Sequence, residues 1–164
     1  MHIPFFAKWP AKIKKDMRYD KRIHHTDIFS TILGAASIEP PKEIKIDGIN
    51  LIPFLTNEKS GEPHQTLYWK NASYQAVIHN DWKLLRSKFP NEQEYLYNLK
   101  KDPYEQNNLA MSELKLKSLL HEKLDTHIES MPKPNWPQSV FMPVVVDKPQ
   151  TEYKKGDELI YWPN

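Results

Sequence analysis

The sequence predicts an α+β fold in which a four-stranded antiparallel sheet is packed by one long helix. Residues 65–99 hold four short segments rich in aromatic and β-branched residues, separated by Asn, Asp, Ser and Pro clusters. This spacing is typical of a meander of short strands. Residues 112–130 repeat apolar side chains at steps of three and four, which indicates an amphipathic helix that covers one face of the sheet.

The segment before the sheet is expected to form a strand and a short helix. Residues 3–9 are an apolar run interrupted and followed by proline, which suits a strand at the surface of a sheet. A buried helix is predicted over residues 26–34, with Thr26 as its N-cap. Its apolar face would hold Ile28, Phe29, Ile32 and Leu33. A turn at Asp47-Gly48 leads into a brief apolar turn at residues 49–55.

The four strands of the sheet are expected at residues 66–69, 74–78, 82–86 and 95–99. Residues 79–81, His-Asn-Asp, predict a tight hairpin turn between the second and third strands. The long helix should start with a serine N-cap at Ser112 and end before Pro132. The segment that follows has no sustained period, although Trp136 and Phe141 favour some contact with the domain surface.

Composition excludes several classes of protein. The 23 Lys and Arg residues are scattered among 21 Asp and Glu residues, for a net charge of +2, so nucleic acid is not an expected partner. The absence of Cys excludes disulfides, thiolate metal sites and a cysteine nucleophile. No apolar run approaches the roughly 20 residues that a bilayer requires, so no membrane contact is expected. The start of the chain lacks the regions of a signal peptide.

Five segments in order resemble the end of bacterial arylsulfatase-like members of the sulfatase family. Residues 3–10 resemble the strand after the family's Glu-Gly-Gly turn, and residues 25–33 its His-x-Asp-hydrophobic-x-Pro-Thr helix. Residues 47–55 are similar to its Asp-Gly-x-x-Leu motif, and residues 82–84 to its Trp-Lys-Leu strand. Residues 96–110 resemble its Leu-Tyr-Asp-Leu-x-x-Asp-Pro-x-Glu-x-x-Asn-Leu segment. Each motif is common alone, but the five in sequence are specific.

The sequence departs from the family pattern at three positions. His2 stands where many members have Arg, Ser30 stands in place of Pro, and Asn98 replaces Asp. The resemblance implies three parts: residues 1–60 as a strand and helix from the end of the larger alkaline-phosphatase-like α/β domain, 61–131 as the C-terminal subdomain, and 132–164 as a Pro-rich irregular tail. It also implies an N-terminal sulfatase domain as a partner. Intact relatives are often periplasmic or secreted, but the compartment of this chain is not determined.

The catalytic groups implied by the resemblance are absent from these residues. Sulfatases use a formylglycine, made from the first residue of a Cys- or Ser-x-Pro-x-Arg motif, and a calcium ion held by carboxylates and an amide. Residues 130–134 read Ser-Met-Pro-Lys-Pro, with Pro where Arg is required, and there is neither Cys nor an Asp-Asp pair. We therefore predict no catalytic residue and no metal ligand here; formylglycine and calcium are implied for the intact enzyme. His25, which matches the family's His, is the one candidate for substrate binding.

Other polar residues have simpler explanations than a second site. His24 and His25 are neighbours in sequence, which favours a polar pair at the start of the helix over a shared metal. His121 and Asp125 share a face of the long helix at i and i+4, but two ligands make a poor metal site, and a solvated face is the simpler interpretation. The aromatic residues of the strands are explained by cross-strand packing rather than by a sugar-stacking platform.

Two functions remain open from the sequence. The first is the C-terminal fragment of a sulfatase, a sulfuric ester hydrolase, which would support one wall of the substrate cleft in the intact enzyme and be inactive alone. The second is a non-catalytic interaction or binding module derived from a sulfatase. In either case several apolar side chains are expected to lose their covering layer in the isolated chain: Phe5, Phe6, Trp9, Phe29 and Ile32.

Overall fold

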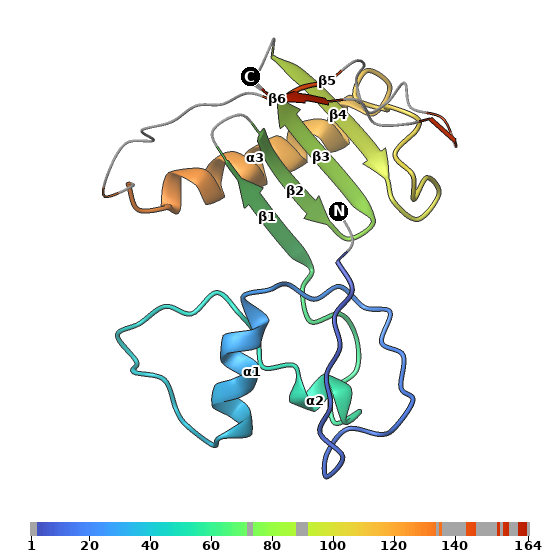
Figure 1. Ribbon diagram of the computed structural model, residues 1–164. Coiled ribbons are helices and arrows are strands. Elements are labelled where there is room, and N and C mark those ends of the chain that lie inside the picture. The colour runs from blue at the N-terminus through green and yellow to red at the C-terminus, as the bar shows by residue number, and fades with distance from the viewer. Residues whose placement is uncertain are drawn as a thin grey trace. The chain divides into compact units, whose positions relative to one another are not determined.

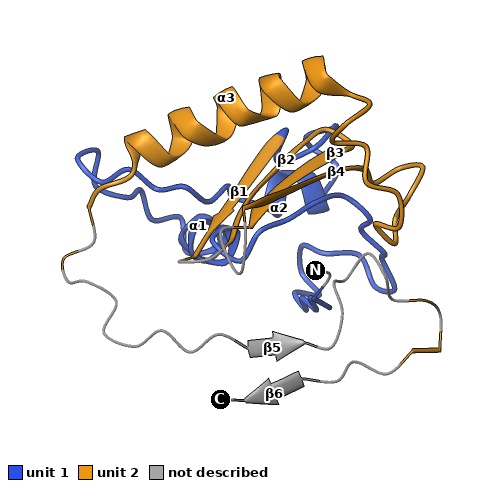
Figure 2. Cartoon of the chain, turned by 90° about the horizontal axis from the view of Figure 1, so that it is seen from above, with its two compact units in different colours: residues 1–65 blue, residues 66–164 orange. Residues whose placement is uncertain are grey.

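The structure is a computed structural model that describes residues 3–71, 74–87, 92–133, 135, 144–146, 154, 156–157 and 161–163. The chain divides into two compact units, residues 1–65 and 66–164. Figures 1 and 2 show the elements of each unit. None of the helices in the described part of the chain is long and apolar enough to span a lipid bilayer.

The second unit contains the predicted antiparallel meander. Its strands are β1 (Thr66–Lys70), β2 (Tyr74–His79), β3 (Trp82–Ser87) and β4 (Gln93–Asn98). They pair in the order β1-β2-β3-β4, and every pairing is antiparallel. Asn80, in the tight turn between β2 and β3, has a positive φ of 51°, a conformation that Asn tolerates better than most residues. The sheet and its hairpin are therefore confirmed.

Helix α3 (Leu114–Ser130) runs along one face of this sheet, as Figures 1 and 2 show. Val77, Leu84 and Leu96 are cross-strand partners on β2, β3 and β4, and so form one apolar row across the sheet. Leu120 and Leu124 of α3 are fully buried in the same core cluster as this row. The observed core thus follows from the period of two along each strand and of 3.6 along the helix. The helix starts two residues after the expected Ser112, with Glu113 at the N-cap position.

The end of the chain adds a small two-stranded sheet. Strands β5 (Val144–Val146) and β6 (Tyr161–Pro163) pair with each other antiparallel. The sequence predicted no regular structure here, because three-residue strands are too short to show a period. Trp136 and Phe141, expected to contact the domain surface, lie outside the described residues.

The first unit is built from two helices and the loops that connect them. Helix α1 (Asp27–Ala35) is the helix expected at residues 26–34, and α2 (Ile52–Leu55) falls within the expected apolar turn. Thr26 is the N-cap of α1, but its side chain does not cap the helix. The position of α1 is confirmed. Its apolar face is not buried in this chain, since Ile28, Phe29 and Ile32 are exposed, as expected for Phe29 and Ile32 where their covering layer is missing.

The strand expected at residues 3–9 does not form, and this prediction was wrong. Ile3, Phe5 and Phe6 are all exposed in an irregular segment. A strand requires a neighbour to pair its backbone N–H and C=O groups, and the described part of residues 1–65 contains no strand. An apolar run can therefore resemble a strand although the pairing partner is missing.

Candidate functional site

The segment that carries the candidate His25 is organised by a buried carboxylate, Asp27. Its Oδ2 accepts a hydrogen bond from the His24 backbone N–H at 2.7 Å, and its Oδ1 accepts one from the Ile49 N–H at 2.9 Å. Nε2 of His64 lies 2.8 Å from both carboxylate oxygens. Asp27 is fully buried, and a buried carboxylate is tolerated where such donors satisfy it. Asp27 therefore joins the start of α1 to two distant positions of the first unit, Ile49 and His64.

The polar side of α1 is directed at the loop of residues 48–51. The Ser30 hydroxyl donates to the Gly48 carbonyl at 2.8 Å, and the Thr31 hydroxyl oxygen accepts from the Leu51 N–H at 3.0 Å. The approach is close at Gly48, where an added Cβ would lie 2.1 Å from the Thr26 carbonyl oxygen. The Asp-Gly motif is thus required sterically, because no side chain fits between the loop and the start of α1.

His24 and His25 lie at the start of α1 with their ring centroids 4.1 Å apart. Nδ1 of His24 is 2.9 Å from the Thr26 hydroxyl. Burial, and then the neighbouring His25, lower the pKa of His24 below its ordinary value, so its imidazole is neutral near pH 7. His25 is exposed, so its ring is accessible to a ligand. Its role in substrate binding stays a prediction.

Calcium, which the family resemblance implies, does not fit the residues described here. Among them no group of three or more His, Cys, Asp or Glu side chains could hold a metal ion. The buried carboxylate of Asp27 faces two backbone N–H groups and an imidazole nitrogen, and N–H donors occupy the oxygens that a hard cation would need. The described residues therefore do not offer calcium the free oxygen ligands that it requires.

A second polar cluster joins the sheet of the other unit to α3. Arg86 on β3 contacts Asp125 through Nη2 at 2.6 Å and Gln75 through Nε at 2.8 Å. Glu94 on β4 lies between Lys117 at 3.2 Å and His121 Nε2 at 2.6 Å. His121 and Asp125 were expected on a solvated helix face; both are partly exposed, at 24% and 49%, and each also pairs with a charged side chain of the sheet. They lie over the sheet, whose charged side chains the sequence analysis did not connect to the helix.

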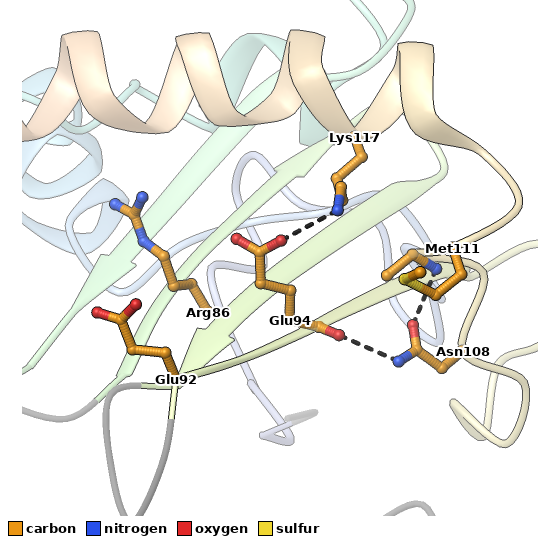
Figure 3. A pocket seen from close by; sticks show the side chains of 7 residues that line it. Arg86, Glu92, Glu94, Asn108, Met111 and Lys117 are labelled. Carbon is orange, nitrogen blue, oxygen red and sulfur yellow. Dashed lines mark hydrogen bonds and ion pairs between the residues drawn. The ribbon is translucent and has the colours of Figure 1, made fainter.

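This cluster borders a pocket of about 360 Å³ that Figure 3 shows from close by. The pocket is lined by Arg86, Glu92, Glu94, Asn108, Ala110, Met111 and Lys117. Two basic and two acidic side chains are among its lining residues; Glu94 pairs with Lys117, and Arg86 pairs with Asp125 of α3. Charged side chains that already pair with one another anchor the helix to the sheet. They are less suited to activating a nucleophile or binding a charged substrate.

The loop after β4 completes the edge of the sheet. Asn108 accepts the Leu96 and Ala110 N–H groups at 2.9 and 3.0 Å and donates to the Glu94 carbonyl at 3.0 Å, as Figure 3 shows in part. Glu105, with a positive φ of 57°, holds the Lys83 ammonium at 2.6 Å. Asn108 and Glu105, in the segment of residues 96–110, therefore satisfy backbone hydrogen bonds and a lysine charge within the domain, which is a structural role.

The antiparallel sheet of four strands crossed by one helix recurs in solved structures. Ps i-CgsB, a solved structure, shares this fold with a TM-score of 0.65 at 20% identity, over 78% of this chain and 29% of that chain. The solved structure of BT4656 has a TM-score of 0.51 at 23% identity, over 63% of this chain and 23% of that chain.

Residues 1–133 match the family model for the C-terminal region of N-sulphoglucosamine sulphohydrolase, and the chain belongs to this family. The sulfatase YdeN of Escherichia coli, itself uncharacterized, is 44% identical over 68 residues, which are 42% of this chain and 12% of that relative. The chain therefore spans a small part of the proteins that it matches.

Sequence reasoning singled out His25 and placed Asp27 only within the motif of residues 25–33, and it missed His64, Arg86 and Glu94. Asp27 and His64 are 37 positions apart, and Arg86 and Asp125 are 39 positions apart. Neither pair belongs to a shared motif or a helical spacing. A pairing of this kind is set by the tertiary fold, so a single sequence contains no local signal for it.

Proposed function

We propose that this chain is the C-terminal part of a sulfuric ester hydrolase, that it supports one wall of the substrate cleft in the intact enzyme, and that it hydrolyses nothing by itself. The observation that carries the proposal is the family match over residues 1–133. The charged groups of the described residues support it, because Asp27, Arg86 and Glu94 are engaged with groups of their own unit.

The substrate class in the intact enzyme is a sulfate ester. The solved relative BT4656 is described with its substrate D-glucosamine-2-N,6-O-disulfate, which is in keeping with this class. His25 is the residue we assign to substrate contact, because it is exposed while its neighbours His24 and Asp27 are held inside the unit. An imidazole can donate a hydrogen bond to a sulfate oxygen.

A fusion tests this proposal. The full chain replaces the corresponding C-terminal part of YdeN, and sulfate release is measured with an aryl sulfate that intact YdeN has first been shown to hydrolyse. We expect the fusion to be active, and His25→Ala in the fusion to raise KM about tenfold with little change in kcat, since a charge-assisted contact is worth about 1.5 kcal/mol.

Lys42→Ala is the matched control, because Lys42 is another exposed ionisable side chain of the same unit. It should leave KM unchanged. Equal KM values for the two variants would rule out a role of His25 in substrate binding. A fusion that folds but releases no sulfate would argue against the cleft-supporting function.

A further inference from the structure

A second pocket lies within the unit of the sheet, between helix α3 and the edge strand β1. Its volume is about 440 Å³, which is within the size range of small-molecule sites. Tyr68 of β1 lines it from the sheet, and residues between Leu119 and Ser130 line it from α3. It shares no lining residue with the pocket of Figure 3. We call it the β1–α3 pocket.

Lys123 is the charged side chain that sets this pocket apart. In the described part of residues 66–164, four Lys and Arg residues are half-buried. Three of them, Lys83, Arg86 and Lys117, each pair with a carboxylate. Lys123 is the fourth, and it lines the pocket without forming an ion pair with any described carboxylate. A half-buried ammonium without a counter-ion carries a desolvation cost, which an anionic ligand in the pocket would offset.

The charge of Lys123 also acts on its surroundings. Burial, and then the charge of Lys123, lower the pKa of His79 on β2 below its ordinary value. The His79 imidazole is therefore neutral near pH 7. Its Nδ1 lies 2.7 Å from the Thr66 hydroxyl, so its place in the sheet does not require a charge. The ammonium of Lys123 is thus the positive group that this end of the sheet presents to a ligand.

The walls of the pocket combine flat rings with an apolar side chain. The rings of Tyr68 and His127 are stacked, with their centroids 3.9 Å apart and their planes at 6°. Burial raises the pKa of Tyr68, so its phenol stays protonated near pH 7 and can donate a hydrogen bond. Leu119, which is 44% exposed, adds apolar surface. Apolar walls with a few polar groups are typical of a site for an organic ligand rather than for a bare ion.

Hydroxyl and carboxylate oxygens complete the lining. The Ser130 hydroxyl donates to the His127 carbonyl at 2.7 Å, and its oxygen keeps a lone pair that can accept. Glu122, an exposed carboxylate, lies next to Lys123 in the sequence and also lines the pocket. Its charge opposes the binding of a bare anion, whereas its oxygens accept hydrogen bonds from hydroxyl groups. The lining therefore suits a ligand that carries both an anionic group and hydroxyl groups.

We propose that the β1–α3 pocket binds a sulfated saccharide, with Lys123 contacting the sulfate and Glu122 a sugar hydroxyl. The choice of sulfate as the anionic group rests on the proposed function, whereas the site itself rests on the pocket and its charges. His25 belongs to the first unit and is not among the lining residues. The pocket is therefore a saccharide site in addition to the substrate contact assigned to His25.

An NMR titration of the isotope-labelled full chain with glucose 6-sulfate tests the site. The backbone amide signals of Tyr68, Lys123 and His127 should shift with the ligand, and those of Arg86 and Lys117 should not. Lys123→Gln should raise the Kd about tenfold, because it removes a charge-assisted hydrogen bond. Lys123 has no carboxylate partner among the described residues to lose, so the variant should fold normally, and the dispersion of its amide spectrum checks this.

Lys115→Gln is the matched control, because Lys115 is an exposed lysine of the same helix that does not line the pocket. It should leave the Kd unchanged. Equal Kd values for the two variants, or the absence of shifts at the pocket, would overturn the site.

Unsulfated glucose and inorganic sulfate separate the two halves of the ligand. Each should bind at least about tenfold more weakly than glucose 6-sulfate, since each lacks one set of contacts. Inorganic sulfate that binds as tightly as glucose 6-sulfate would reduce the pocket to an anion site, and equally tight glucose would remove the role of the sulfate. Either result would contradict the proposal.

This titration and the YdeN fusion can fail independently. An active fusion, made from a chain whose pocket signals do not shift, would overturn the saccharide site and leave the proposed function intact. A fusion that folds but releases no sulfate, made from a chain that binds glucose 6-sulfate through Lys123, would contradict the proposed function and support the site.

Discussion

Replacing Asp27 with Ala should destabilise residues 1–65, by about 1–3 kcal/mol for each buried donor that loses its acceptor. The change would leave the backbone N–H groups of His24 and Ile49 without their acceptor and His64 without its carboxylate. Each buried group that loses its partner adds a desolvation cost. No surface position of this unit should approach such an effect.

Amide hydrogen exchange at His24, Ile49 and Leu51 measures this loss locally. Asp20→Ala is the matched control, since Asp20 is an exposed carboxylate of the same unit paired with Arg18 at 2.7 Å. An exposed pair of this kind contributes little to stability, so exchange should be nearly unchanged in the control. Similar exchange rates in the two variants would contradict the role given to Asp27.

Replacing Leu120 with Ala should destabilise the sheet and helix unit by about 2–5 kcal/mol. Leu120 is fully buried among Val77, Leu84, Leu96 and Leu124. The substitution removes apolar contact and leaves a cavity that a packed sheet cannot close. The large loss of stability is expected from the position of Leu120 rather than from its residue type, and a neighbouring leucine tests this.

That neighbour is Leu119, which is 44% exposed on the same helix. Leu119→Ala changes the same atoms at almost the same point of α3, and should cost under about 1 kcal/mol. Urea denaturation of both variants gives the comparison from the transition midpoints, provided the slopes agree. A cost for Leu119→Ala as large as that for Leu120→Ala would show that α3 packs by a different face.

The sheet and the long helix could be predicted because their local patterns and their tertiary roles agree. Runs of aromatic and β-branched residues separated by turn residues mark the strands. The three and four residue steps along α3 place Leu120 and Leu124 on the face that meets Val77 and Leu84. The turn at Asn80 adds a consistent conformational signal. The strand, turn and helix signals thus favour the same structure. A single sequence is most informative when its local signals agree in this way.

The first unit was harder to predict, for a physical reason. The period of α1 showed correctly that Ile28, Phe29 and Ile32 share a face, but a period does not tell which way that face points. The orientation is set by the hydrogen bonds of Asp27, Ser30 and Thr31 to residues 48–51.

The candidate site was predictable only in part. His25 and Asp27 belong to a short motif and could be found as such, whereas His64 reaches Asp27 from 37 positions away. The pairs of Arg86 with Asp125 and of Glu94 with His121 likewise join a strand to a helix. Predicting contacts between distant positions requires the fold or many related sequences, and a single sequence provides neither.

Sulfate release by the purified full chain is the most direct test of the central claim, which is that the catalytic groups are supplied from outside these residues. The chain is incubated with an aryl sulfate, with and without added calcium, beside intact YdeN as a reference. We predict release at the background rate in both conditions. Turnover above background by the chain alone, abolished by a substitution within residues 1–164, would contradict the account.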